Sequence, residues 1–139
     1  MSLEVRIITP EKVFLTCETE QVILPAVNGG SGSLADHAPL VTVLEPGVVR
    51  YESNGTWTPA VLYGGFAEVE NNQITVLVNG AEEVSSLADL QSIEKAFIDA
   101  TETLEKVKES NVAPSEIDSA VLEVRIAKAR LDAVTSLKS

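Results

Sequence analysis

The sequence is poor in the residues that build metal sites, disulfides and catalytic triads. Of its 139 residues, one is a cysteine (Cys17) and one is a histidine (His37). A single cysteine forms no disulfide within the chain, and structural zinc sites need several cysteine or histidine ligands. We therefore expect no metal site and no cofactor, and we interpret Cys17 as a small apolar residue in a strand.

Basic residues and long apolar runs are also scarce. The chain carries 10 Lys and Arg against 21 Asp and Glu, a net charge of −11. Nucleic acids and anionic lipid headgroups both need a basic surface, so this balance argues against either partner. No apolar run approaches the roughly 18 residues of a membrane span, and the first residues lack the pattern of a signal or transit peptide. We expect no nucleic-acid binding and no direct membrane insertion. A protein partner with a basic surface fits better, unless the acidity serves only solubility.

Apolar residues are nevertheless plentiful, and up to Ser85 they follow the period of a strand. They make up 45% of the chain, which is enough to bury a core. Short runs alternate apolar and polar side chains, as half-buried strands do. Asn-Gly and Asn-Asn pairs separate several of them, and both residue types tolerate the positive φ of tight turns. Short strands with regular turns predict a sandwich or barrel, with strands at residues 3–7, 12–17, 20–24, 40–44, 48–51, 59–63, 66–69 and 73–78.

The last third of the chain has the period of an α-helix. Residues 90–107 and 117–134 each place six apolar side chains at alternating spacings of three and four, the seam of a helix that packs on another helix. Pro114 separates the two runs. Ser86 or Asp89 is expected to cap the first helix, and Ser115 the second.

These patterns predict an α+β fold. An N-terminal antiparallel β-sandwich in residues 1–84 is followed by a C-terminal antiparallel two-helix hairpin in residues 85–139. The second helix also carries a further apolar stripe, which a two-helix hairpin cannot bury within itself. It rests either on the β half, permanently or conditionally, or on another protein. The stripe consists of Leu122, Ile126, Ala129 and Ala133.

The glycine-rich segment before His37 lacks the sequence context of a phosphate-binding loop and that of a serine nucleophile. A phosphate-binding loop opens a helix and, in the P-loop case, includes a lysine, whereas this segment lies between strands and no lysine follows it. A serine nucleophile needs a nearby base on a strand–turn–helix elbow, which is also lacking. We therefore interpret His37 as a turn residue, or as one hydrogen-bonded at a partner interface.

Charged clusters are the remaining candidates. Glu68 and Glu70 fall on one strand face and are interpreted as solvated, and Glu82 and Glu83 form a further acidic pair. The one basic cluster, on the second helix, is either a solvated face or a contact with acidic residues of another subunit. These residues alone predict a non-enzymatic interaction module with a movable helical hairpin. The basic cluster is Arg125, Lys128 and Arg130.

Three stretches together carry a family resemblance. They are His37-Ala38-Pro39-Leu40, Pro46-Gly47-Val48, and the run GGFAEVENNQITVLVN at residues 64–79. In this order, followed by the helical region, they resemble the epsilon subunit of F-type ATP synthase, which is equivalent to the mitochondrial delta subunit. The first residues look closest to chloroplast and cyanobacterial versions.

The resemblance implies a non-catalytic subunit of the central stalk, bound to the gamma subunit and the c-ring. Such a subunit helps to couple proton-driven rotation to ATP synthesis, and its C-terminal helices can inhibit ATP hydrolysis by contacting the alpha/beta catalytic head. It also implies a peripheral membrane protein, on the stromal side of the chloroplast thylakoid or the cytoplasmic side of a bacterial membrane. The alternative is a stand-alone β-sandwich ligand-binding or adaptor protein.

Site residues follow from the resemblance position by position. His37, Ala38 and Pro39 lie on the edge expected to approach gamma or the ring, and Ser33 replaces a usual aliphatic residue. The loop expected to face the c-ring is Asn28, Gly29, Gly30, Ser31 and Gly32.

Some bacterial members of the family bind ATP in the helical domain through an Ile/Leu-Asp-x-x-Arg-Ala motif. Asp89 is retained here, but Ser92 replaces the arginine. A serine hydroxyl cannot replace the paired hydrogen bonds of a guanidinium group, so we expect weak or absent ATP binding.

Overall fold

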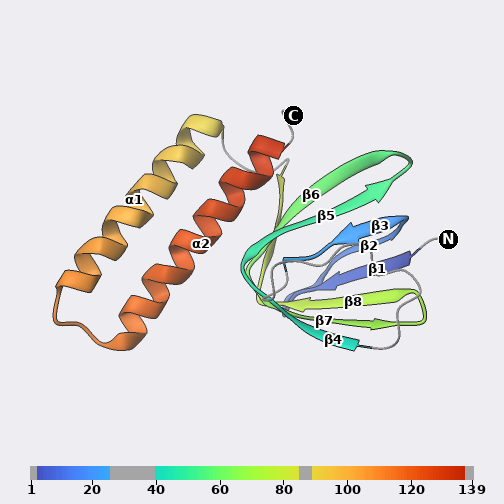
Figure 1. Ribbon diagram of the computed structural model, residues 1–139, viewed down its shortest axis with the longest axis horizontal. Coiled ribbons are helices and arrows are strands. Elements are labelled where there is room, and N and C mark those ends of the chain that lie inside the picture. Colours follow the sequence, from blue (N-terminus) through green and yellow to red (C-terminus); the bar gives the residue numbers. More distant parts are fainter. Residues whose placement is uncertain (1–2, 26–39, 85–88, 137–139) are drawn as a thin grey trace.

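A computed structural model describes residues 3–25, 40–84 and 89–136, and shows a two-layer β-sandwich beside a helical hairpin (Figure 1). The predicted α+β fold class is confirmed. The helices are α1 (Leu90–Glu109) and α2 (Pro114–Ser136). The described strands are β1 (Leu3–Ile8), β2 (Val13–Thr19), β3 (Gln21–Ile23), β4 (Leu40–Leu44), β5 (Gly47–Ser53), β6 (Thr56–Leu62), β7 (Gly65–Glu70), β8 (Gln73–Val78) and β9 (Ala81–Glu83).

The two sheets differ in size and in one pairing. One has the order β2-β1-β8-β7-β4 and the other the order β3-β5-β6-β9. All paired strands are antiparallel as predicted, except β1 and β8, which run parallel with Glu4 opposite Gln73. The alternating pattern identifies the buried face of a strand but not its neighbour, so it did not reveal this pair. The three-residue strand β9 was missed because it is too short to show a period.

Asparagine and glycine make the tight turns where the sequence predicted them. Asn54 and Gly55 have φ angles of 54° and 81° between β5 and β6, and Asn71 and Asn72 have 51° and 61° between β7 and β8. A two-residue hairpin turn that matches the twist of its strands needs positive φ at both positions. These turns fix the register of both hairpins.

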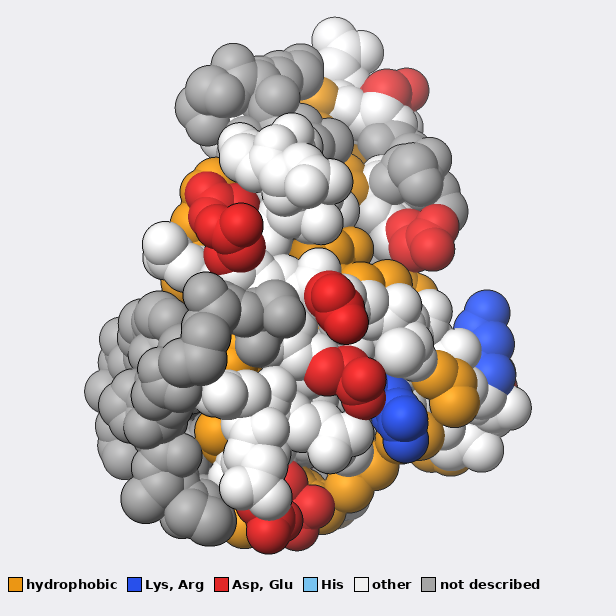
Figure 2. Space-filling view, turned by 90° about the vertical axis from the view of Figure 1, so that its right-hand side faces the viewer, with side chains coloured by type: hydrophobic (Ala, Val, Ile, Leu, Met, Phe, Trp, Pro, Cys, Tyr) orange, Lys and Arg blue, Asp and Glu red, His pale blue; other side chains and the backbone are white. Residues whose placement is uncertain are grey.

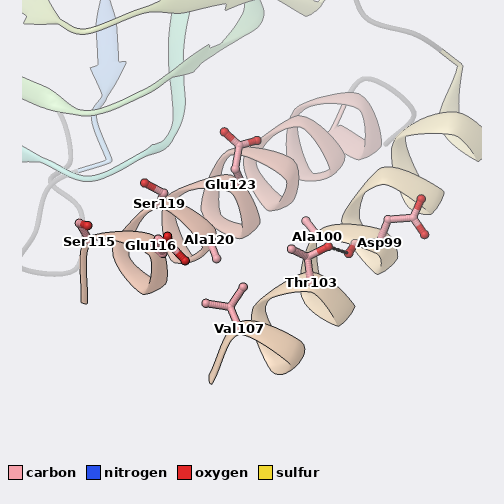
Figure 3. A pocket seen from close by; sticks show the side chains of 9 residues that line it. All are labelled: Asp99, Ala100, Thr103, Val107, Ser115, Glu116, Ser119, Ala120 and Glu123. Carbon is pink, nitrogen blue, oxygen red and sulfur yellow. Dashed lines mark hydrogen bonds between the residues drawn. The ribbon is translucent and has the colours of Figure 1, made fainter. Parts of the chain in front are cut away.

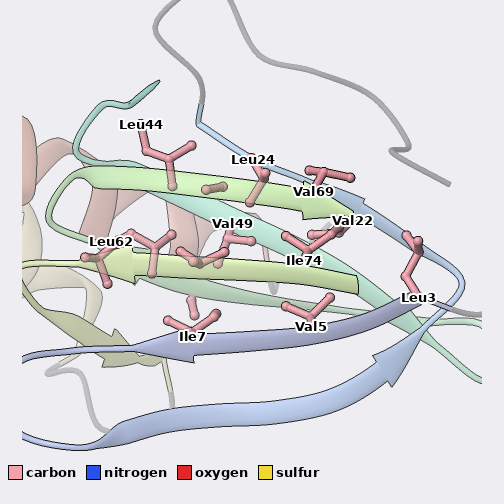
Figure 4. Close-up of a cluster of buried hydrophobic side chains, with 14 residues drawn as sticks. Leu3, Val5, Ile7, Val22, Leu24, Leu44, Val49, Leu62, Val69 and Ile74 are labelled. Atoms are coloured by element: carbon pink, nitrogen blue, oxygen red, sulfur yellow. The ribbon is translucent and has the colours of Figure 1, made fainter. Parts of the chain in front are cut away.

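The core lies between the two sheets (Figure 4). Alternate side chains of β1 and β8 point inward, and Val5, Ile7 and Ile74 are fully buried. Burying one such side chain contributes about 1.5–3 kcal/mol. The inward residues shown in Figure 4 include Leu3, Val22, Leu24, Leu44, Val49, Leu62 and Val69.

The predicted N-terminal cap is correct for α1 and wrong for α2. The Asp89 carboxylate accepts a hydrogen bond from the Ser92 backbone N–H at 2.9 Å and caps α1, as predicted. The other candidate cap, Ser86, lies outside the described residues. The predicted Ser115 cap is wrong, because α2 already begins at Pro114. Proline suits the first helical position, where its fixed φ is favourable and its missing N–H has no partner to lose.

Candidate functional site

Two predicted contact segments lie outside the described residues. They are the c-ring-facing loop, residues 28–32, and the edge formed by residues 37–39, with Ser33 between them. Their roles stay predictions. Cys17 is described on β2, and burial raises the pKa of its thiol, which agrees with its interpretation as an apolar strand residue.

The second apolar stripe of α2 rests on the outer face of the four-stranded sheet. Ala129 and Ala133 are 2% and 0% exposed, and they pack against Val48 and Val61. The small alanine side chains let the helix lie close to the sheet. Most of the stripe is therefore covered by the chain's own β half in this structure.

The helix docks through its C-terminal half. Ile126, like the two alanines beyond it, is buried, whereas Leu122, nearer the start of α2, stays 41% exposed. Arg130 lies beside Ala129, at the edge of this contact.

A hydrogen-bonded cluster of three side chains ties α2 to strand β9. Arg130 Nε donates to Glu82 Oε1 at 2.8 Å, and Nη2 donates to Oε2 at 2.6 Å. The Tyr63 hydroxyl donates to the same carboxylate. The side chains of Arg130 and Glu82 are 33% and 16% exposed, so the pair is partly shielded from water. We call these residues the Tyr63–Glu82–Arg130 cluster.

The cluster stabilises its charged form. Burial by itself would raise the pKa of the Glu82 carboxyl, but hydrogen bonds from Arg130 and Tyr63 outweigh it and hold that pKa below its ordinary value. Burial and the neighbouring carboxylate raise the pKa of Tyr63, and the hydrogen bonds to Glu82 raise the pKa of Arg130. At neutral pH the cluster therefore holds one carboxylate, one guanidinium and one neutral phenol.

Gly80 makes room for the tyrosine of this cluster. A Cβ atom at Gly80 would lie 2.4 Å from the Tyr63 ring, well inside contact distance. The Tyr63 backbone N–H also donates to the Gly80 carbonyl at 3.0 Å. The ring therefore lies directly over the backbone, which aims its hydroxyl at Glu82.

The other two basic residues of α2 make weaker contacts. Lys128 pairs with Asp132 one turn later at 2.8 Å, and Arg125 Nη1 lies 4.0 Å from Glu45 Oε1. All four of these side chains are at least 44% exposed, and exposed pairs contribute little. The predicted basic cluster thus divides into two solvated cations and one that is anchored.

Sequence reasoning missed Glu82 because its partner lies 48 positions away. Glu82 and Glu83 were read as one acidic pair. One feature of the sequence could have indicated this pairing. Arg130 follows Ala129 of the second apolar stripe, and a cation at the edge of a buried contact needs an acidic partner.

Neither described helix packs on the outer face of the five-stranded sheet, and an apolar row crosses this face. The strand registers place Val43 opposite Phe66, Phe66 opposite Leu77, Leu77 opposite Ile8, and Ile8 opposite Val13. Val43, Phe66 and Val13 are 60%, 43% and 56% exposed. We call these five residues the apolar row.

The same face becomes acidic away from the apolar row. Glu70 pairs with Gln73, which lies opposite Glu4, and Glu4 lies opposite Glu18. Glu68 and Glu70 are exposed on β7, as predicted. Figure 2 shows acidic side chains spread over the end of the sandwich that lies farthest from the helices.

The described residues, 3–25, 40–84 and 89–136, show no membrane-spanning helix and no metal-binding cluster. Neither described helix is long and apolar enough to cross a bilayer. No described trio of His, Cys, Asp or Glu side chains gathers in a metal-binding arrangement.

Comparison with known proteins gives consistent matches. The family described as ATP synthase, Delta/Epsilon chain, beta-sandwich domain, matches residues 2–84. The chloroplast ATP synthase epsilon chain of Pyropia yezoensis is 43% identical over 139 residues, which is all of both chains. The ATP synthase epsilon chain of Cyanothece sp. is 43% identical over 133 residues, 96% of this chain and 95% of the relative.

A solved structure shows the same fold. A chain in the Euglena gracilis mitochondrial ATP synthase superposes with a TM-score of 0.75 at 18% identity, covering 99% of this chain and 82% of the other. The family match and the full-length relatives together show that the chain belongs to the delta/epsilon chain family of ATP synthases.

Proposed function

We propose that the chain is a non-catalytic rotor subunit in the central stalk of an F-type ATP synthase. In this proposal residues 1–84 bind the gamma subunit and the c-ring, and help to couple proton-driven rotation to ATP synthesis. Membership of the family and the names of the full-length relatives support it. The observation that carries the binding role is the apolar row on the open sheet face.

The apolar row has the character of an interface. Five apolar side chains lie opposite one another across one exposed face, although neighbours on the same strands such as Leu44, Ala67 and Val76 are buried in the core. Contiguous exposed apolar surface on a folded protein marks a contact site. In the proposed assembly the gamma subunit covers this row, residues 28–32 contact the ring, and residues 37–39 contact gamma or the ring.

Co-purification tests the binding role. Val43 and Phe66 are both changed to Glu, and the chain is co-expressed with gamma and c subunits. Loss of gamma is expected, because two charges would be buried in an apolar contact with it. The control replaces Glu68 and Glu70 by Gln on the same face and keeps both partners. Full recovery of gamma with the double-Glu variant would exclude this face and favour a stand-alone adaptor.

We further propose that residues 85–139 are a regulatory element that can inhibit ATP hydrolysis. In the docked state Arg130 is occupied by Glu82, so it is not available to acidic residues of the alpha/beta catalytic head. Release of the hairpin would free Arg130, and Arg125 and Lys128 would face the head with it. The cluster thus makes docking and inhibition compete for one cation.

Two substitutions separate these roles in the assembled complex. Glu82→Gln weakens docking and leaves all three cations, so inhibition of ATP hydrolysis is expected to increase. Arg130→Ala weakens docking to a similar degree but removes a cation, so it should inhibit less than Glu82→Gln. Equal ATPase activity of both variants and the wild type would count against the regulatory role.

The remaining parts of the proposal concern nucleotide and location. Asp89 already uses its carboxylate to cap α1 at Ser92, which supports weak or absent ATP binding. Tight binding in calorimetry on the full chain would overturn this. The chloroplast and Cyanothece relatives support a peripheral position on the stromal side of a thylakoid or the cytoplasmic side of a bacterial membrane.

A further inference from the structure

The two helices leave an open groove between them, near the loop that joins them (Figure 3). It has a volume of about 540 Å³, and Ala100, Val107 and Ala120 form its apolar floor. Ala100 on α1 and Ala120 on α2 occupy seam positions, where a leucine or valine would fill more of the space between the helices. The groove is therefore a direct result of small residues placed within the two seams.

The rim of the groove is acidic. Asp99 stands on α1, and Glu116 and Glu123 stand on α2, so carboxylates border the apolar floor from both helices (Figure 3). None of the described residues that line it is basic. All three carboxylates belong to exposed residues, so a partner can contact them without any rearrangement of the hairpin.

The dimensions suit a helix. From Asp99 to Val107 the groove follows α1 for about 12 Å at 1.5 Å per residue, which is roughly two helical turns. An amphipathic helix lying in such a groove presents apolar side chains one turn apart to the floor. Lysine or arginine at its flanks would meet the carboxylates. A second copy of this chain, with a net charge of −11, would be repelled instead.

We propose that the α1–α2 groove binds a basic amphipathic helix of a partner protein, which adds to the hairpin as a third helix. The site is separate from the apolar row and from the Tyr63–Glu82–Arg130 cluster. It is open while the hairpin is docked, so a partner can bind there without displacing the hairpin from the sheet.

The test uses the isotopically labelled full chain and a synthetic helix of Leu and Lys, roughly 18 residues or five turns long. Saturable binding is expected, with amide shifts centred on Ala100, Val107 and Ala120. Changing Asp99 to Asn and Glu116 and Glu123 to Gln should weaken binding about tenfold, as the loss of three exposed ion pairs would.

Two further variants make the result specific. Glu94→Gln, Glu105→Gln and Asp118→Asn remove the same charge from exposed positions that do not line the groove, and should bind like the wild type. Ser119→Trp fills the groove from an exposed position and should abolish binding. The proposal would be overturned if the two triple variants weakened binding equally, or if Ser119→Trp bound the helix like the wild type. Either result would mean that the basic helix is attracted to the acidic chain as a whole and not to the groove. Because the chain is tested alone, neither outcome depends on the stalk function.

Discussion

The β-sandwich and the helical hairpin are held together in different ways. In the sandwich, inward side chains such as Val49 and Ile74 are completely buried between two sheets. In α1, which the structure describes throughout, Ile93 is the buried residue. α1 contacts mainly α2, and α2 in turn rests on β5 and β6. The hairpin therefore depends on a single layer of contacts, whereas the sandwich has its own core.

The difference indicates two units of unequal stability. Regions with few buried apolar contacts open at a lower free energy than the core of the same protein. We therefore expect the sandwich to stay folded if the hairpin leaves it. A regulatory role needs this inequality, since a hairpin as firmly held as the core could not be released.

The largest expected effect comes from breaking the sandwich itself. Ile74→Ala removes a fully buried side chain from the centre of the five-stranded sheet and should lower the free energy of unfolding by about 3–4 kcal/mol. Denaturant titration measures the loss. Ile98→Ala on α1 is the control, because Ile98 is 54% exposed and its truncation should cost about 0.5 kcal/mol or less. Similar losses at both sites would erase the distinction between the two units.

Overpacking the contact between the units should have the next largest effect. Ala133→Leu places a larger side chain where exposure is 0%, and should weaken docking by about 1–3 kcal/mol. Hydrogen exchange is expected to speed up in α1 and α2 and to stay unchanged in β1 and β8. Ala96→Leu, at an exposed position of α1, is the matched control. Faster exchange throughout both units would mean that they unfold together.

A smaller effect is expected at the Tyr63–Glu82–Arg130 cluster. Arg130→Ala leaves a shielded carboxylate without its main partner and should weaken docking by about 1–2 kcal/mol, less than for a fully buried pair. Lys128→Ala removes an exposed pair and should cost about 0.5 kcal/mol or less. A double-mutant cycle with Glu82→Gln measures the coupling by hydrogen exchange of α2 amides. A coupling near zero would show that packing alone holds the hairpin.

The smallest expected effect is a pH dependence of docking. The folded-state pKa of Glu82 is lowered from 4.5, so its contribution is present above that pH and is lost as pH falls through the lower value. The pKa of Tyr63 is raised from 10.0, so its contribution is present below that pH and is lost as pH rises through the higher value. Each loss should be about 1 kcal/mol or less.

The nuclear Overhauser effect between the Ala133 and Val61 methyl groups reports docking across this range. It should stay constant between the two limits and decrease beyond them. Tyr63→Phe should remove the alkaline decrease and keep the acidic one. A decrease centred near neutral pH would point to a group outside the cluster.

Local features of the fold were predictable because neighbouring residues determine them. Asn54-Gly55 and Asn71-Asn72 form their turns through their own backbone preferences, and Asp89 caps α1 by reaching three residues ahead. The apolar seams of both helices follow from a repeat within each segment. These signals need no knowledge of what lies across the fold.

Features that join distant segments could not be read in this way. The parallel pairing of β1 with β8 depends on which strand lies next to which, and periodicity does not contain that information. Arg130 was predicted only as part of a basic cluster, since its pairing with Glu82 requires the helix to be placed on the sheet. The apolar row likewise appears only after five strands are aligned.

The parallel pair also sets an order of events during synthesis on the ribosome. β1 lies in the interior of its sheet, and its partner at Gln73 is made 69 residues after Glu4. At about 5–20 residues per second, the first strand waits several seconds before its sheet can close. The helices are synthesised only afterwards, when the folded sheet is already available for α2 to pack against. The newborn sandwich can thus fold before the hairpin has been made.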